Sequence, residues 1–559
     1  MPITEIAIEN FKGIGSKQTI PLRPITLLFG GNSAGKSTIL QALHLFKEVL
    51  KTGSSDVDKL IPGTPSLDIG GFNQYVHNHD PDKKVRISVT MEVDDDGLPE
   101  YHTRDSIDVA IDVSTVGIEI EIRWDRTRDR SFVSRLTSYV DSSVFAITTK
   151  DESDALTTLG DIRTSAPGIT SAIEELFPDD HDHGEALTRL TQDYPNPKYL
   201  EYLKDKEREY LDEELADDTP MELHPGDNIT SEDIPLPLEI YLRDKPIIPE
   251  PRVGFLCDSD DELLEELEDG AITNWLLTRI ITGSTDLLRE ELEGTRYIGS
   301  LRTIPERGYR GQASISPDRW ANGLAAWDLL SRSGKDREWL DTAIADINAL
   351  DLGCTIDRAN KVSISGEGGK RIRELRMRLV HTTDDRPDLE QLIREILEID
   401  AHMVLNTSLT LMTKDGKAEV EPCDVGVGVS QVIPVVIGVL EPKHSILMVE
   451  QPELHIHPRV QCALGDVLAK QAVKNPSKIQ LLETHSEHLV LRLLKRIKET
   501  TRGKLEKGDP ALTPDDVAVL YIESQDIGVF IKELRVDEHG RFKDDWPQGF
   551  FEERFDELF

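Results

Sequence analysis

Residues 30–38 read GGNSAGKST and follow the apolar run PITLLFG, residues 24–30. Gly30, four variable residues and then Gly35, Lys36 and Ser37 match the phosphate-loop pattern G-x-x-x-x-G-K-[ST]. The apolar run predicts a strand, and STILQALHLFKEVL, residues 37–50, predicts an amphipathic helix. A strand, a glycine-rich turn and a helix start are the local structure that such a loop needs, because the amides at the helix start face the phosphates. The stretch therefore predicts an α/β fold that binds a nucleotide.

The residue types in this stretch suit the phosphates of a nucleotide. The glycines let backbone N–H groups curl around a β-phosphate, Lys36 reaches the β- and γ-oxygens, and the Ser37 hydroxyl binds Mg²⁺. The alternative is an ordinary tight turn, which the filled motif and its correct flanks disfavour. The predicted nucleotide-binding residues are Gly30, Asn32, Ser33, Ala34, Gly35, Lys36, Ser37 and Thr38.

A second stretch, ILMVEQPE at residues 446–453, predicts an apolar strand that ends in Glu450, Gln451 and Glu453. A carboxylate at the tip of a parallel strand is where a Mg²⁺ shell needs one. About thirty residues later KIQLLETHSEH predicts another strand, followed by His485 and a helix. We expect Glu450 to bind the metal and His485 to lie near the γ-phosphate.

Together these motifs resemble those of the ABC-class ATPases, in the branch that holds the SMC-like and overcoming-lysogenization-defect (OLD) families. The resemblance covers roughly residues 1–80 and 400–559. It implies ATP and Mg²⁺ as cofactors and a homodimer that encloses two ATP molecules. The tail WPQGFFEERFDELF, residues 546–559, resembles the ending of a bacterial subgroup of these ATPases.

Three further motifs follow from the resemblance. DVGVGVSQVIPVV, residues 424–436, resembles the signature segment, which implies that Gly428, Ser430 and Gln431 face the γ-phosphate of a second subunit's nucleotide. DIGGFNQYVHN resembles the Q-loop and makes Gln74 a candidate metal ligand, and His485 resembles the switch histidine. The alternatives are a plain turn for the signature glycines, a surface loop for Gln74 and a neighbour of a helix cap for His485.

Gln451 stands where the family has a catalytic glutamate. Glutamine cannot act as a base, although its amide can orient a water, and Glu453 two residues later offers a carboxylate. The predicted catalytic residues are therefore Gln451, Glu453 and His485. We expect tight nucleotide binding and slow hydrolysis.

The chain has 559 residues, a net charge of −40 and 38% apolar residues. Such a charge repels nucleic acid unless a local basic groove overrides it, so nucleic acid is a possible partner that the composition does not indicate. No apolar run is long enough to predict a membrane span, and the first residues predict a strand rather than a signal peptide, so we expect a cytoplasmic protein.

The fold class predicted is α/β: an ABC-type ATPase head with a central parallel sheet, an antiparallel β subdomain and a largely helical insertion. The predicted ranges are 1–80 for the first part of the ATPase lobe, 81–150 for the antiparallel subdomain, 151–350 for the acidic insertion, 351–510 for the second part of the lobe, and 511–559 for a strand, a hairpin and an aromatic tail.

The function predicted is that of a sensor or scaffold in a bacterial antiphage complex. About 75 residues follow His485, too few for the nuclease domain of OLD proteins, and no long heptad repeat predicts an SMC-type arm. Stand-alone ATPases of this build resemble the ATPase subunits of the Septu and PARIS systems, which implies a separately encoded effector such as a nuclease. The alternatives are a DNA-repair or DNA-end-binding ATPase and a purely structural, nucleotide-locked assembly protein.

Overall fold

The structure is a computed structural model, and it describes residues 2–53, 69–94, 97–100, 109–150, 156–160, 167–176, 240–243, 248, 275–331, 338–364, 403–525 and 528–546. The chain divides into two compact units. The first unit comprises residues 1–295, 477–479 and 518–534, and the second comprises residues 296–476, 480–517 and 535–559.

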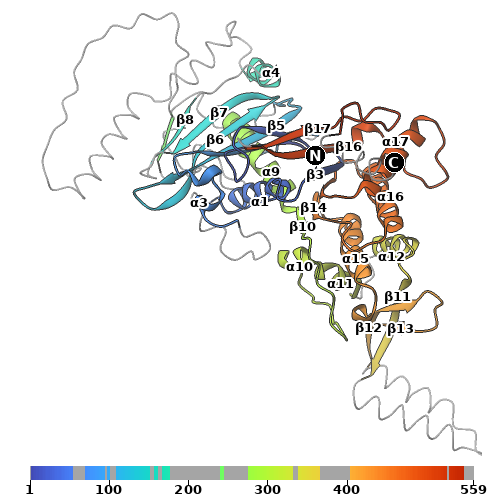
Figure 1. The fold of residues 1–559 in the computed structure, drawn as a ribbon. Coiled ribbons are helices and arrows are strands. Elements are labelled where there is room, and N and C mark those ends of the chain that lie inside the picture. Colours follow the sequence, from blue (N-terminus) through green and yellow to red (C-terminus); the bar gives the residue numbers. More distant parts are fainter. Residues whose placement is uncertain are drawn as a thin grey trace, which may run out of the picture. The chain divides into compact units, whose positions relative to one another are not determined.

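The largest sheet of the first unit is antiparallel throughout (Figure 1). The described residues give it eight strands in the order β2-β1-β4-β5-β6-β7-β8-β9. Their bounds are β1 Ile3–Glu9, β2 Gln18–Pro21, β4 Val85–Glu92, β5 Thr115–Asp125, β6 Arg130–Val140, β7 Ser143–Lys150, β8 Leu156–Gly160 and β9 Ile240–Arg243.

The period-two pattern of this sheet is the reason that the sequence predicted it. Alternate residues of β4, from Val85 to Met91, are almost completely buried, whereas the residues between them are partly exposed. The sheet includes residues outside the predicted range 81–150. Strands β1 and β2 extend it at one edge, and β8 and β9 extend it at the other. The hydrophobic pattern of β1 shows a strand but not which neighbour it pairs with.

Helix α1, Lys36–Thr52, packs on β1 and β4 of this sheet and on helix α9, Gly283–Glu293. A π-helical turn, η3 Thr278–Thr282, leads into α9. The same unit holds β3 Ile25–Gly30, β16 Val517–Gln525 and β17 Gly528–Glu533, which are neighbours in that order. Its remaining helical elements are α3 Phe72–Tyr75, η2 His77–His79 and α4 Pro167–Leu176.

The second unit is built around three neighbouring strands, β10 Arg296–Ile298, β14 Ile446–Glu450 and β15 Ile479–Glu483. Strands β10 and β14 are parallel. A separate antiparallel sheet has the order β11-β12-β13, with bounds Cys354–Ile364, Met403–Thr413 and Glu419–Val420. The helical elements are α10 Pro317–Ala321, α11 Leu324–Ser331, α12 Glu338–Ala349, α15 Val427–Leu440, α16 Pro458–Lys474, α17 Glu487–Thr501, η4 Pro422–Asp424 and η5 Pro514–Asp516.

The mixed α/β class with parallel and antiparallel pairing is confirmed. In the last part of the range predicted as a largely helical insertion, 151–350, the described residues form α10, α11 and α12. Much of the insertion predicted at 151–350 and most of the aromatic tail lie outside the described residues. In the described part of the chain, no helix is long and apolar enough to cross a membrane.

Candidate active site

The first group of candidate residues lies in the first unit, in the loop between β3 and α1. Gly30, Ser33 and Gly35 all have positive φ angles, of 151°, 61° and 100°. Helix α1 begins at Lys36, has no side-chain cap and carries no acidic residue in its first turn. The positive end of the helix dipole therefore lies at this loop, with no carboxylate of the first turn to neutralise it, and this favours an anion there. This is the conformation that the motif predicted.

Lys36 is almost completely buried, with 4% of its surface exposed. Its Nζ donates to the carbonyl oxygens of Gly31 at 2.9 Å and Gly30 at 3.2 Å. The loop thus holds the ammonium group within its own curve, close to the helix start. Asn32 and Ser33 are exposed, whereas Ala34 and Thr38 are buried.

Two strands near the end of the chain, β16 and β17, pack against this loop. A Cβ on Gly30 would lie 2.2 Å from the carbonyl oxygen of Ile522 in β16. A Cβ on Gly35 would lie 3.1 Å from a methyl group of Val529 in β17, and the Val529 amide donates to Gly13 O at 2.8 Å. The sequence predicted both strands but gave no sign that they pack against the glycines of the loop.

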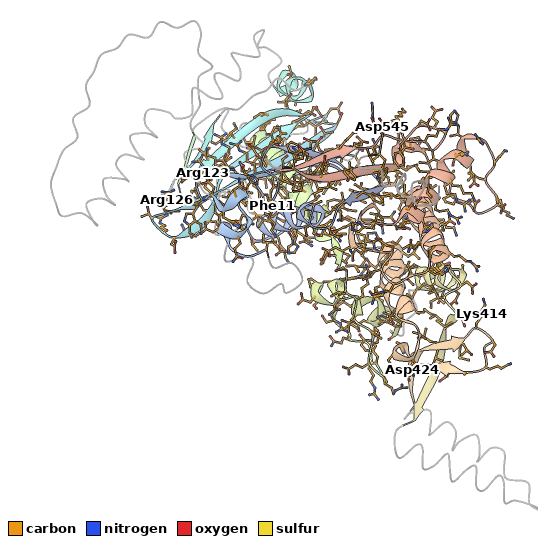
Figure 2. All side chains as sticks on the ribbon, in the orientation of Figure 1. Phe11, Arg123, Arg126, Lys414, Asp424 and Asp545 are labelled. Atoms are coloured by element: carbon orange, nitrogen blue, oxygen red, sulfur yellow. The ribbon has the colours of Figure 1, made fainter. Side chains whose placement is uncertain are left out.

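Gln74 lies in the short helix α3 and is exposed. The helix is anchored by Tyr75, whose ring lies 5.6 Å from that of Phe11, labelled in Figure 2. The side chain of Gln74 lies over Gly70, where an added Cβ would be 1.6 Å from its Oε1. The described contacts do not include one between Gln74 and the loop at 30–38, and its role in a metal shell stays a prediction.

A second group of candidate residues lies in the second unit, at the end of β14. Glu450 Oε1 accepts a hydrogen bond from the hydroxyl of Tyr297 at 2.9 Å. Burial raises the pKa of Glu450 and the nearby Glu483 adds to this effect, although the hydrogen bond from Tyr297 opposes it. Gln451 follows with a φ of 44°, a left-handed conformation that a non-glycine residue adopts rarely, and its amide donates to Glu483 O at 2.7 Å. The chain therefore bends sharply right after the carboxylate.

Glu453 joins this bend to the segment that carries His485. Its Oε2 accepts from the Thr484 hydroxyl and its Oε1 from the His485 amide, both at 2.7 Å. Ser486 then caps α17 by accepting from the Leu489 amide at 3.0 Å. The structure thus brings Glu450, Gln451, Glu453 and His485 into one region of the second unit, and it gives Glu453 a structural role that we did not predict.

The signature segment forms the start of α15. Gly428 is required by packing, since a Cβ there would lie 2.6 Å from His455 O. Ser430 is completely buried and Gln431 is 4% exposed, whereas Val427 is 42% exposed. Gly426 and Val427 are exposed residues of this segment. Ser430 and Gln431, whose side chains were predicted to face a second subunit, are buried within their own unit.

Arg302 is a residue that the sequence analysis missed. Its guanidinium is buried and donates to the carbonyl oxygens of Glu450 and Gln451, while its main chain pairs with the Gln431 side chain. Burial lowers the pKa of Arg302 to about 10, against the opposing influence of Glu453 and Glu450, so the group is charged at neutral pH. An arginine in a segment of no marked pattern gives no sequence signal of this kind.

The loop at 30–38 suits a polyphosphate, because a buried cation and a helix start without a side-chain cap meet where the chain admits no Cβ at Gly30. Among the described residues, no group of three or more His, Cys, Asp or Glu side chains forms a metal site. Mg²⁺ does not require such a cage, since it is commonly held by one or two carboxylates together with phosphates and water. Ser37, at the start of α1, and Glu450, at the end of β14, each carry an oxygen donor of the kind that Mg²⁺ binds, and their role as metal ligands stays a prediction.

The comparisons with protein families agree with this division of the motifs. Residues 1–217 match a family described as "AAA ATPase domain", and residues 331–492 match "AAA domain, putative AbiEii toxin, Type IV TA system". Residues 512–559, which include β16 and β17, match "Protein of unknown function (DUF3696)". The phosphate loop lies in the first match and Glu450, Gln451 and His485 lie in the second, so the chain resembles ATPase domains in both halves.

No curated protein matches the chain. Among solved structures it is similar to an SMC head bound to the C-terminal winged-helix domain of ScpA, with 10% identity, a TM-score of 0.36 and coverage of 96% of this chain and 99% of that chain. The corresponding values are 12%, 0.35, 96% and 97% for an SMC head with an extended coiled coil bound to the C-terminal domain of ScpA from Pyrococcus furiosus, and 7%, 0.35, 96% and 100% for the SMC head domain from Thermotoga maritima.

Proposed function

We propose that the protein binds ATP with Mg²⁺ through the loop at 30–38 and hydrolyses it slowly. The observation that carries the proposal is Lys36, a buried ammonium held by the carbonyls of the loop at an uncapped helix start. Mg²⁺ enters the site together with ATP. We propose Ser37 and Glu450 as its protein ligands, with Gln74 as a further candidate. The matches to ATPase families in both halves of the chain support it.

The slow rate is proposed from Gln451. Its main chain is fixed on both sides, because its amide donates to Glu483 O and its carbonyl accepts from Arg302. The side-chain amide of Gln451 can orient an attacking water, but it cannot take the water's proton. Glu453 holds Thr484 and His485 in place through both of its oxygens, so we assign it to supporting His485 as well as to catalysis.

At the level of the cell, we propose a homodimer that closes around two ATP molecules and acts as sensor or scaffold for a separately encoded effector such as a nuclease, in antiphage defence. One of the matching families is described as a putative toxin of a type IV toxin–antitoxin system, which favours a role beside a second gene product. The exposed start of α15, at Gly426 and Val427, is the surface of the signature segment available to a second copy.

Binding is tested by Lys36→Ala in isothermal titration calorimetry with ATP and Mg²⁺. Removal of the cation from the β- and γ-phosphates should abolish detectable binding. The matched control is Lys47→Ala, on the same helix, whose Nζ lies 3.5 Å from Thr295 O and outside the motif. Unchanged affinity in Lys36→Ala would refute the proposal.

The slow rate is tested by measuring ATP turnover in two variants, one that replaces an amide by a carboxylate and one that replaces a carboxylate by an amide. Gln451→Glu supplies a base and should raise the rate, whereas Glu453→Gln loses one of the two acceptors for Thr484 and His485 and should lower it. If Gln451→Glu leaves the rate unchanged or reduces it, the glutamine does not stand in place of a base.

A further inference from the structure

Arg302 connects two motifs of the second unit that are far apart in sequence. Its Nη1 and Nη2 lie 3.2 and 3.1 Å from Gln451 O, and Nη2 also donates to Glu450 O. Its side chain is buried, with 4% of the residue exposed. One planar guanidinium therefore holds two successive carbonyls at the end of β14, at the point where the chain bends.

The main chain of Arg302 is held in turn by helix α15. Gln431 Nε2 donates to Arg302 O at 2.9 Å, and the Arg302 amide lies 3.4 Å from Gln431 Oε1. The amide side chain thus pairs with both polar groups of one peptide residue. A continuous path of hydrogen bonds runs from Gln431 through Arg302 to the carbonyls of Glu450 and Gln451.

A buried arginine is a poor device for stability alone, because the loss of its hydration offsets much of what its bonds contribute. Here its acceptors are the carbonyls of the two residues that carry the proposed metal ligand and the water-orienting amide. A guanidinium fork fixes the direction of both carbonyls, which a single ammonium cannot do. The placement is therefore suited to orienting the bend.

We propose that Arg302 is a positioning residue for ATP hydrolysis, which fixes the main chain at Glu450 and Gln451 and couples that bend to the signature helix through Gln431. The inference rests on the proposed function. The inference adds to the proposed function a connection, within one unit, between the start of α15 and the end of β14.

Arg307 provides a matched comparison in the same segment. It also reaches the residues before α15, since its Nη2 lies 2.6 Å from Oδ1 of Asp424, which is labelled in Figure 2. Its side chain is 66% exposed, however, and within the described part of the chain it makes no hydrogen bond to Glu450 or Gln451. An exposed ion pair of this kind contributes little.

The test compares Arg302→Lys with Arg307→Lys. Lysine keeps the charge but cannot hold both carbonyls, so Arg302→Lys should lower kcat about tenfold or more, with KM and the affinity for Mg²⁺-free ATP within about twofold of wild type. Mg²⁺ should also raise the affinity for ATP less in Arg302→Lys than in the wild type. This measurement does not depend on hydrolysis. Arg307→Lys should match wild type in every measurement.

The coupling to α15 is tested with Gln431→Met, alone and combined with Arg302→Lys. The single variant should lower kcat without changing KM, and the double variant should be no slower than Arg302→Lys, because both changes break one path. Gln431→Met also keeps the test decisive if Arg302→Lys fails to fold. A wild-type kcat and a wild-type effect of Mg²⁺ on ATP affinity in Arg302→Lys, or losses that multiply in the double variant, would overturn the inference. Failure of the wild type to bind ATP would instead refute the proposed function.

Discussion

In the phosphate loop of the first unit the shape comes from the backbone of one continuous stretch, whereas at the end of β14 in the second unit it comes from side chains that reach from distant segments. The loop depends on glycines at 30 and 35 and on a lysine that bonds its own neighbours. The bend after Glu450 depends on Tyr297, Arg302 and Thr484.

This difference decides how each half responds to change. A continuous loop tolerates only substitutions that keep its backbone conformation, so its failures are steric. A bend held by hydrogen bonds from elsewhere fails when one donor is lost, even if its own residues are intact. The predictions below separate these two kinds of failure.

The largest effect is expected from Gly30→Ala. The new methyl group would lie 2.2 Å from the main-chain oxygen of Ile522, at a φ of 151° that only glycine adopts readily. The loop must then move away from β16, and ATP affinity measured by calorimetry should fall by about a hundredfold or more, which is roughly 2.7 kcal/mol.

Gly31→Ala is the matched control for that substitution. It lies one residue further on, within the same motif, and a Cβ there would meet nothing within 4 Å. Its affinity for ATP should stay within a few-fold of wild type. Equal losses in both variants would show that ATP binding does not depend on the close approach of Gly30 to β16.

The same contrast explains how much the sequence could predict. The loop at 30–38 was predictable residue by residue, because the information for its shape lies in nine adjacent positions. The strands before Glu450 and before His485 were predictable from apolar runs. Ser430 and Gln431 were assigned to an interface by resemblance, and the burial of both residues could not be foreseen, since it depends on how α15 packs.

Arg302 and Val529 could not be predicted for a different reason. Arg302 lies about 150 residues before the carbonyls that it holds, and Val529 lies about 500 residues after the glycine that it contacts. Local patterns carry no information on such pairs. The sequence thus predicted which residues bear the chemistry but not which residues hold them in place.

A second prediction concerns a buried charge in the first unit, where the partners are side chains rather than carbonyls. Glu121 in β5 has 1% of its side chain exposed and accepts from Arg86 and Arg123, the latter labelled in Figure 2, each at 2.8 Å. Burial by itself raises the pKa of Glu121, but these hydrogen bonds outweigh it and lower the pKa to about 2. The folded state therefore favours the ionised form.

A carboxylate with a lowered pKa stabilises the fold above its ordinary value near 4.5, and this contribution is lost as the pH falls towards 2. The shift corresponds to roughly 3 kcal/mol. Hydrogen exchange of peptides from β5 and β6 should show the wild-type sheet losing protection across that window. Glu121→Gln should be less protected already at pH 7 and should change less with acid.

Glu119→Gln is the control, two residues away on the same strand and paired with the largely exposed Lys17 at 3.6 Å. It should alter protection by less than about 0.5 kcal/mol. If Glu121→Gln behaves like Glu119→Gln, the acid sensitivity of this sheet does not depend on the buried carboxylate.

The smallest effect on the protomer itself is expected from Val427→Glu, which tests the surface of the second unit rather than its interior. Val427 is 42% exposed at the start of α15, so the substitution should change the free energy of unfolding by less than about 0.5 kcal/mol. It places a carboxylate on the surface proposed to meet a second copy and its nucleotide, where like charges repel.

Light scattering should therefore show that Val427→Glu loses the increase in mass that ATP causes in the wild type. Val473→Glu, which changes a valine that is 41% exposed in α16, should keep that increase. Ser430→Arg is a poorer test, because it puts a charge at a completely buried position and disturbs folding before association. If Val427→Glu and Val473→Glu show the same ATP-dependent mass as wild type, the start of α15 is not part of a nucleotide-dependent interface.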